Sequence, residues 1–330
     1  MTPRYTVSTK ALFAVCAAVL AVQAYRDAIA DIRPDEAYLY DRFVRPTARQ
    51  IWQQELPNRD VLFTFLEKRS VGMFHVSPFS VRAPGLLFLA LYLWSAWQLG
   101  RLLSGRAWMH LGLVSVAAGA CLWWGWFNSA NGIGAAIALQ LSAFRYALEY
   151  LKRNDAVTPD NLNLSGCCLG LSVAARWEFA VPAVALVLML LIVLICQGKL
   201  SQWVDRVLIS AIVAALIPLV LPLSHAHAAA QPPASLDSRK AAELQSALDA
   251  LRASAGTLPV RIGASAAVEP VANFYRAQHR LVSWSRVDRG LESGSLDYYL
   301  LARSDDAYVQ QRHLIVLSRD ADFVVARKSP

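Results

Sequence analysis

Long apolar runs dominate the first two thirds of the chain. A helix needs about 20 consecutive apolar residues to cross the hydrocarbon core of a bilayer, and several runs here approach that length. The first extends from Ala11 to Ala24, and a transmembrane helix there would continue to Ile29. Further membrane spans are predicted at 83–103, 107–126, 131–151, 163–176, 178–197 and 205–224. The pattern therefore predicts a multi-pass membrane protein, mainly α-helical, with about seven transmembrane helices.

The first apolar run has two interpretations. Arg4 and Lys10 precede it, and the small residues at 21–24 resemble a signal-peptide cleavage site. The run can equally be an uncleaved first transmembrane helix, which we favour because further spans follow it. Both interpretations predict the same orientation, because positive charges before the first span stay in the cytoplasm.

The stretch from Leu162 to Ile195 is too long for a single crossing. Arg176 and Glu178 interrupt it, and charges at the centre of a bilayer are costly. Two helices that turn at Arg176–Glu178 avoid this cost. They also place the basic loops on one side, the cytoplasm, as the positive-inside rule requires; these loops contain Arg4 and Lys10, Arg101 and Arg106, Lys152 and Arg153, and Lys199 and Arg206. Loop 31–82 and the C-terminus are then expected in the periplasm.

Loop 31–82 is polar and aromatic, and four prolines divide it. Two short amphipathic helices of the kind that lie in a membrane interface are expected in it, at Arg49–Leu56 and Val61–Phe74. In the second helix one side is expected to be apolar and the other exposed to water. The apolar side would hold Leu62, Phe65, Leu66 and Met73, and the exposed side Glu67, Lys68 and Arg69.

The pattern changes after an Ala- and Pro-rich linker at 226–235. Helices are expected at Leu236–Ala253, where leucines recur at helical spacing, and at Val268–Gln278. Short apolar runs predict strands at Pro259–Ile262, Leu281–Val287, Tyr298–Leu301, His313–Leu317 and Phe323–Ala326. Residues 236–330 are therefore expected to form a small periplasmic α/β domain.

Composition and charge support this division. The chain of 330 residues is 56% hydrophobic and 17% charged, against about 25% charged in soluble domains. Its net charge of +8 does not indicate nucleic-acid binding, because the basic residues flank apolar runs and form no basic cluster interleaved with aromatic residues. The five cysteines lie in apolar runs without metal-ligand spacing, so they are expected to be small buried hydrophobes.

The clearest candidate for chemistry is Asp35-Glu36-Ala37-Tyr38, just after the first span. A carboxylate at the membrane surface can act as the general base toward an acceptor hydroxyl. A helix N-terminus also favours acids, and Pro34 suits the first helical position. Both interpretations stay open from the residues alone.

The motif continues in an ordered series: 58–67 (NRDVLFTFLE), 70–77 (SVGMFHVS) and 78–84 (PFSVRAP). Together with the apolar pattern, this series resembles the GT-C superfold of membrane glycosyltransferases, specifically the family 39-like group of protein mannosyltransferases and lipid A aminoarabinose transferases. The resemblance covers roughly residues 8–225, and stretches 260–276 and 297–301 are similar to the tail of such proteins.

The resemblance implies transfer of a sugar from a polyprenyl-phosphate donor to a periplasmic glycan, lipid or protein acceptor, without a nucleotide. Asp35 would be the base, supported by Glu36, with Tyr38 beside them. The implied phosphate-binding cations are Arg59, Arg82 and Arg176, and the implied helpers are Asp60 and Glu178. Each of these arginines can instead be a side chain that extends to the membrane interface. Some members use a divalent cation near the acids and others do not.

The chain departs from this group in two ways. Arg59 occupies a position where histidine is frequent. The chain also passes from the seventh predicted helix directly to its tail, whereas these enzymes usually have several further helices. An inactive scaffold or accessory subunit is therefore the alternative to an enzyme. A transporter is less favoured, because its spans would carry ionisable residues, whereas the charges here lie at span ends.

Overall fold

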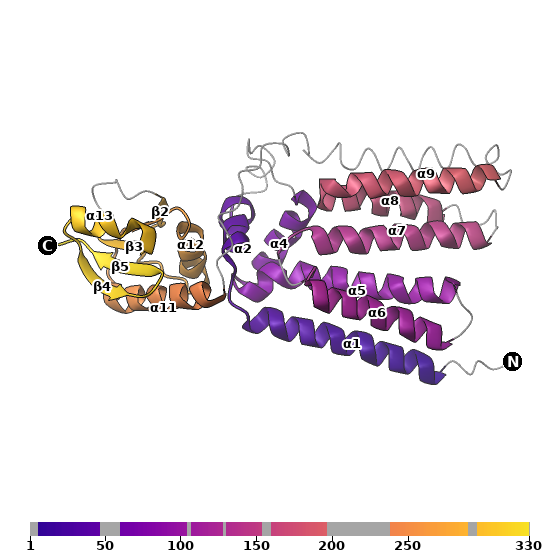
Figure 1. The fold of residues 1–330 in the computed structure, drawn as a ribbon, viewed down its shortest axis with the longest axis horizontal. Helices are drawn as coiled ribbons and strands as arrows, with labels where there is room; N and C mark the ends of the chain where they lie inside the picture. The colour runs from indigo at the N-terminus through magenta and orange to yellow at the C-terminus, as the bar shows by residue number, and fades with distance from the viewer. Residues whose placement is uncertain are drawn as a thin grey trace. The chain divides into compact units, whose positions relative to one another are not determined.

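The computed structural model describes residues 6–46, 60–103, 107–127, 130–153, 160–196, 238–289 and 296–329. These residues are mainly helical, with one small mixed sheet (Figure 1). The chain divides into two compact units, which are described separately. The first unit comprises Met1–Ile29, Ala48–Ser70 and Arg82–Ala230, and the second comprises Ala30–Thr47, Val71–Val81 and Gln231–Pro330.

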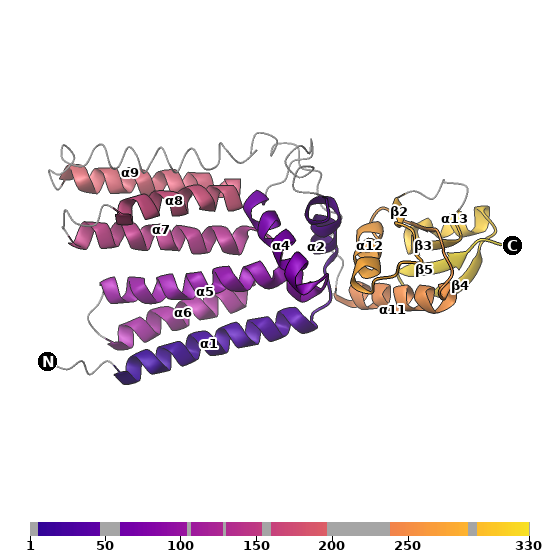
Figure 2. The same ribbon diagram turned by 180° about the vertical axis from the view of Figure 1, so that it is seen from behind.

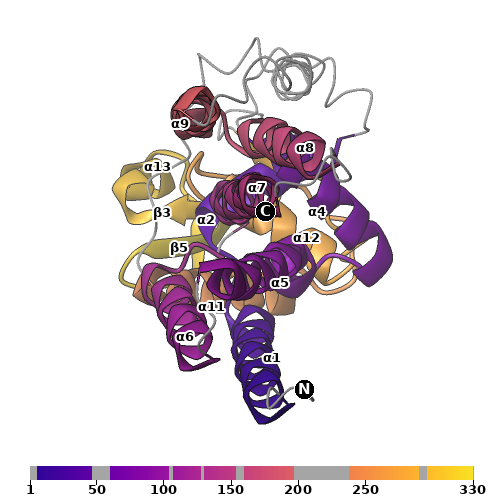
Figure 3. The ribbon, with the colours of Figure 1, turned by 90° about the vertical axis from the view of Figure 1, so that its right-hand side faces the viewer.

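The first unit is built from long helices that run alongside one another (Figures 1 and 2) and are seen end on in Figure 3. They are α1 (Thr6–Ile29), α5 (Pro78–Leu103), α6 (Ala107–Trp124), α7 (Ile133–Arg153), α8 (Asp160–Ala175) and α9 (Ala180–Cys196). The shorter α4 (Val61–Phe74) is oblique to them. The last turn of α4 and the first of α5 belong to the second unit.

The structure confirms a helix at each predicted span that it describes. It also confirms the expected turn after α8, because Arg176 is extended and the short 3-10 turn η2 (Trp177–Phe179) leads into α9. The predicted span 205–224, the helix Arg49–Leu56 and the linker 226–235 lie outside the described residues.

Small and hydroxyl side chains hold the helices of the first unit together. Helices α7 and α8 pack on each other where Ala136 and Ala143 are fully buried. The hydroxyl of Ser172 donates to the Ala136 carbonyl at 3.0 Å, and that of Ser165 donates to the Ala143 carbonyl at 2.9 Å. Small residues let helix backbones approach closely, and buried hydroxyls then bond across the gap. Larger apolar residues pack beside these contacts, among them Leu162 against Leu190.

Many apolar side chains of the first unit face outward. On α9, Val181 is 78% exposed and Ile192 60%, and on α1, Phe13 is 75% exposed. The side chains of Gln23 and Asp27, in contrast, are buried, and the amide of Gln23 donates to Asp27 Oδ1 at 2.8 Å. The first unit therefore exposes many large apolar side chains, while its interior contains both polar residues and apolar ones such as Leu89 and Leu93.

The expectation for α4 is corrected in the same way. Glu67 is buried, whereas Met73 is 58% exposed. The buried face is formed by Phe63, Glu67 and Ser70, at i, i+4 and i+7 of one helical stripe. The prediction is thus wrong for Glu67 and Met73, whereas Arg69 is exposed as expected and Leu62, Phe65 and Leu66 are partly buried.

Among the described residues, two helices are long and apolar enough to cross a bilayer. They are Lys10–Ile29 and Pro78–Leu103. Gly112–Trp123, Asn161–Ala175 and Trp177–Val193 are shorter apolar helical stretches.

The second unit contains a five-stranded sheet in the order β2-β1-β3-β5-β4. Its strands are β1 (Ile262–Ala264), β2 (Asp288–Arg289), β3 (Tyr298–Ala302), β4 (Ile315–Arg319) and β5 (Phe323–Arg327). Strand β1 pairs in parallel with β2 and β3, whereas β5 runs antiparallel to β3 and β4. Helices α11 (Ser238–Ala255), α12 (Glu269–Gln278) and α13 (Asp306–Gln311) complete the α/β arrangement.

Helix α11 packs against β3, β4 and β5. Its leucines 244, 248 and 251 are at most 1% exposed, which confirms the apolar stripe that the sequence predicted. The turn between β1 and α12 begins at Ser265, whose carbonyl accepts from the backbone N–H groups of Val268 and Glu269.

The expectation of a strand at Leu281–Val287 is wrong. Within this run only Trp284 pairs, through an isolated bridge to Val260, and strand β2 begins after it at Asp288. Trp284 and Val287 are each 1% exposed, so the run fills the core with its side chains without extending the sheet. The sequence analysis also did not predict α13.

Replacing Leu248 with alanine should destabilise the second unit by about 2–5 kcal/mol, because the cavity would lie in a closely packed core. Thermal unfolding of the full chain in detergent, followed by near-UV circular dichroism, measures the change. The matched control is Leu258→Ala, because Leu258 is 71% exposed, and its effect should stay within about 0.5 kcal/mol. Equal effects of the two substitutions would contradict the packing described for α11.

Candidate functional site

The acidic motif lies on a short helix of the second unit, α2 (Pro34–Leu39), which continues into the π-helical turn η1 (Tyr40–Val44). Arg33 is extended before the helix, and Pro34 occupies its first turn. Proline suits this position because its ring fixes the helical φ and the first N–H groups lack helical partners. The local sequence therefore sets where α2 begins.

Glu36 has a structural role. It is 1% exposed, and its carboxylate accepts a hydrogen bond from the backbone N–H of Arg33 at 3.0 Å. The Arg33 guanidinium lies 3.7 Å from the same carboxylate. An acid at this position that reaches back to the N-cap residue forms half of a capping box. The contacts of Glu36 therefore support the interpretation that this acid stabilises a helix N-terminus.

Asp35 lies in a different environment. Its side chain is half-buried, and among the described residues no hydrogen bond or ion pair reaches its carboxylate. Tyr38, on the same helix, is half-buried and packs edge-on against Phe43, with ring centroids 6.4 Å apart. Asp35 is thus the acid of the pair whose carboxylate is not bonded within the described residues.

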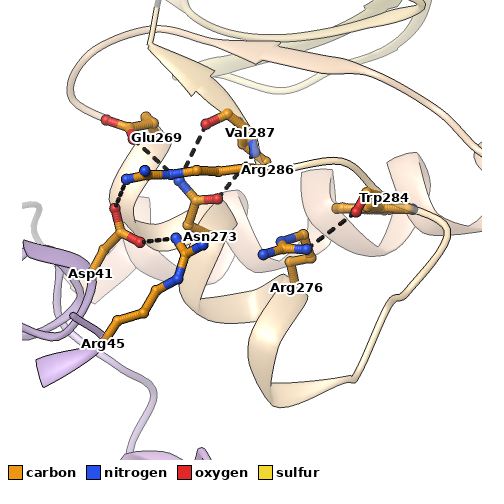
Figure 4. A network of polar contacts seen from close by, with 8 residues as sticks. All are labelled: Asp41, Arg45, Glu269, Asn273, Arg276, Trp284, Arg286 and Val287. Carbon is orange, nitrogen blue, oxygen red and sulfur yellow. Dashed lines mark hydrogen bonds and ion pairs between the residues drawn. The ribbon is translucent and has the colours of Figure 1, made fainter. Parts of the chain in front are cut away.

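A contact that the sequence did not predict joins this segment to the C-terminal residues of the same unit (Figure 4). Helix α12 packs against α2 and η1. The ring of Tyr40 meets that of Phe274 edge-on at 5.2 Å. Asp41, 7% exposed, accepts from Arg45 Nη1 through Oδ1 at 2.8 Å and from Arg286 Nη2 through Oδ2 at 2.9 Å.

Asn273 fixes the loop that carries Arg286. This asparagine is 2% exposed, and its Oδ1 accepts from the Val287 N–H at 3.0 Å. Its Nδ2 donates to the Val287 carbonyl at 3.3 Å and to Glu269 Oε1 at 3.1 Å. Both ends of the buried amide are therefore satisfied, which holds the loop rigidly against α12.

Arg276 of α12 lies near Asp41, Arg45 and Arg286, whose charges act on it. Its Nη1 donates to the Trp284 carbonyl at 3.2 Å (Figure 4). Burial, followed by the charge of Arg45, lowers the pKa of Arg276, and the carboxylate of Asp41 acts in the opposite direction. Burial also raises the pKa of the Tyr40 hydroxyl nearby.

The implied phosphate-binding residue Arg82 is buried in the first unit. It is 2% exposed, and its Nη1 donates to the Asp27 carbonyl at 3.4 Å. This carbonyl belongs to the last turn of α1, where backbone acceptors lack helical partners. The contact therefore gives Arg82 a role in ending α1.

Asp60, Arg176 and Glu178 lie around the turn between α8 and α9. The carboxylate of Asp60 is 2.9 Å from the point that a Cβ on residue 132 would occupy, and the same Cβ would collide with the Ala175 carbonyl oxygen. Only glycine fits at position 132. The structure thus brings Asp60 next to the turn at which Arg176 Nε donates to Glu178 Oε2 at 3.0 Å.

The described residues therefore hold the predicted site residues in two sets: Asp35, Glu36 and Tyr38 in the second unit, and Asp60, Arg82, Arg176 and Glu178 in the first. Arg59 lies outside the described residues. Within the described ranges, no three His, Cys, Asp or Glu side chains come together to hold a metal ion. Binding of a divalent cation near the acids therefore stays a prediction from the sequence.

Comparison with known proteins found no matching family model, no matching curated protein and no matching solved structure.

The sequence analysis missed Asp41, Arg45, Arg276 and Arg286. Part of the signal was present, because an acid and an arginine four residues apart on a helix are expected to pair, as Asp41 and Arg45 do. Arg286 is 245 residues from Asp41 along the chain, and no local pattern indicates such a partner.

Replacing Asp41 with asparagine should loosen the segment 34–44, because the variant loses the charge that two guanidinium groups share. Both arginines are partly exposed, so the expected loss is only about 1 kcal/mol. Hydrogen–deuterium exchange of the full chain measures it as faster exchange in the peptides that cover α2 and η1.

The matched control is Asp320→Asn, since Asp320 lies in the same unit and no side-chain contact of it is seen among the described residues. This variant should leave the exchange of 34–44 unchanged. Unchanged exchange in Asp41→Asn would show that the two ion pairs do not hold the segment.

Proposed function

We propose that this chain is a membrane glycosyltransferase that moves a sugar from a polyprenyl-phosphate donor to a periplasmic acceptor. Asp35 takes the proton of the acceptor hydroxyl, whose oxygen forms the new bond to the anomeric carbon. The bond from that carbon to the phosphate oxygen breaks, and polyprenyl phosphate leaves. No nucleotide takes part in this reaction.

The observation that carries the proposal is the difference between the two neighbouring acids. Glu36 is buried and bonded to the backbone of Arg33, so its carboxylate is engaged in the fold. Asp35 is half-buried, with no side-chain partner seen in the part of the chain that the structure describes. A general base needs a carboxylate that the substrate can reach and that no internal partner occupies. Only Asp35 of the pair meets this condition.

The outward apolar surface of the first unit supports a membrane location. Side chains such as Phe13 and Val181 are more than 70% exposed, and contiguous apolar surface of this kind needs lipid or a protein partner to cover it. We propose that the helices form a GT-C-like bundle of seven spans in a bacterial inner membrane, with the N-terminus in the cytoplasm and residues 236–330 in the periplasm.

Arg176 is a better candidate than Arg82 for receiving the phosphate. Arg82 is 2% exposed and bonded to the end of α1, whereas the Arg176 side chain is 21% exposed and pairs with Glu178, whose side chain is 37% exposed. A surface ion pair is held weakly, so an incoming phosphate can take the guanidinium from Glu178. Arg59, which lies outside the described residues, stays a candidate for binding the phosphate.

Asp35→Asn should abolish sugar transfer while leaving the fold intact, because the amide keeps the shape of the carboxylate and cannot accept the proton. Loss of a general base lowers rates by about 10²–10⁴-fold. The measurement is the glycan phenotype of cells that carry the variant, together with the thermal stability of the purified chain.

Glu36→Gln is the matched control at the adjacent position. This change weakens the contact with Arg33, so it should lower the unfolding temperature while keeping part of the transfer activity. A normal glycan phenotype in a stable, membrane-inserted Asp35→Asn protein would refute the catalytic assignment. The chain would then be better described as a non-catalytic membrane scaffold or accessory subunit.

The proposed topology has its own test. Alkaline phosphatase is active only after export, so fusions after Phe127 and Arg327 should be active and a fusion after Arg153 inactive. Green fluorescent protein at the same positions should give the opposite pattern. Phosphatase activity after Arg153, or none after Arg327, would contradict the proposed number or orientation of the helices.

A further inference from the structure

Three arginines from separate parts of the second unit gather around Asp41 (Figure 4). Arg45 follows η1, Arg276 lies on α12, and Arg286 lies in the loop before β2. The Asp41 carboxylate gives one oxygen to Arg45 and the other to Arg286. Arg276 is close enough to this group that Arg45, Asp41 and Arg286 all act on its charge.

Positive charge exceeds negative charge at this cluster. The three guanidinium groups carry three positive charges, and Asp41 and Glu269 supply two negative ones, which leaves +1. Glu269 is moreover bonded to the Asn273 amide. Guanidinium groups stay charged at any physiological pH, so the surplus cannot be removed by loss of a proton.

Hydrogen-bond donors also exceed acceptors. Each guanidinium offers five N–H donors, yet among the described residues each of the three is seen to make a single hydrogen bond, with Asp41 or with the Trp284 carbonyl. Nε of Arg276 is buried and has no partner among these residues. Arg45 and Arg286 keep 37% and 52% of their side chains exposed, so a ligand can reach them.

We infer that Arg45, Arg276 and Arg286 form a binding site for a phosphate group. Phosphate brings several acceptor oxygens and up to two negative charges, which fits several guanidinium forks better than a single carboxylate does. Asp41 and the Trp284 carbonyl already hold the forks in place, and such preorganisation reduces the entropy lost on binding.

This inference does not rest on the proposed transferase activity. The phosphate can belong to a soluble molecule or to a lipid headgroup, because both present the same oxygens. The experiment uses the purified full chain in nanodiscs of phosphatidylcholine, without phosphate buffer. One arm titrates inorganic phosphate by isothermal calorimetry. The other compares thermal unfolding in these discs with unfolding in discs that contain phosphatidic acid.

Arg286→Gln and Arg276→Gln should each weaken phosphate binding about tenfold, the loss expected for one charge-assisted contact. Arg327→Gln is the matched control, since it removes an exposed arginine of the same unit outside the cluster, and should change the affinity less than twofold. Arg286→Lys keeps the charge beside Asp41 but loses the planar guanidinium. Its phosphate affinity should therefore lie between those of Arg286→Gln and the Arg327→Gln control.

Phosphate binding that the two glutamine variants weaken supports a site open to soluble phosphates. Stabilisation by phosphatidic acid alone, lost in the same variants, supports the site with a lipid headgroup as its source. The inference fails if the wild-type chain responds in neither arm, or if Arg286→Lys and both glutamine variants, shown to be folded by circular dichroism, respond like the wild type.

Discussion

One buried carboxylate joins the segment 34–44 to the C-terminal residues of the second unit. Asp41 is 7% exposed and divides its two oxygens between Arg45 and Arg286, which are far apart in the sequence. Burying a carboxylate is costly unless its oxygens are bonded, and here each oxygen has a guanidinium partner. The interaction holds the segment that carries Asp35 against α12, and Tyr40 and Phe274 add an apolar contact beside it.

The acidic pair illustrates how environment separates two chemically similar groups. Asp35 and Glu36 are neighbours in sequence, but successive side chains of a helix point about 100° apart. Glu36 consequently turns back to the start of α2 and satisfies a backbone N–H, whereas Asp35 turns away from this contact. One acid is bonded at the start of the helix and the other is not bonded within the described residues, so unlike surroundings separate two similar carboxylates.

The two units differ in how many large apolar side chains they expose, although both bury apolar residues. In the first, Gln23, Asp27 and Glu67 are buried while Phe13 and many valines and leucines are exposed. In the second, α11 and the sheet enclose an ordinary apolar core that contains Leu248 and Trp284. The change coincides with the change in hydrophobic pattern along the chain. The prediction for α4 failed at two positions, since Glu67 is buried and Met73 is exposed, whereas Arg69 is exposed as expected.

The sequence by itself determined the helices of the first unit and the turn at Arg176–Glu178, because long apolar runs and the cost of burying charge are local properties. It likewise determined α11, α12 and three of the strands, whose apolar side chains recur at regular spacing. The run 281–287 was misjudged, because apolar residues that fill a core and those that extend a sheet look alike in sequence. Only the tertiary structure decided which acid of the pair is engaged, and only it brought Arg276 and Arg286 to Asp41. Those contacts join residues more than 200 positions apart, and no periodicity along the chain encodes such a distance.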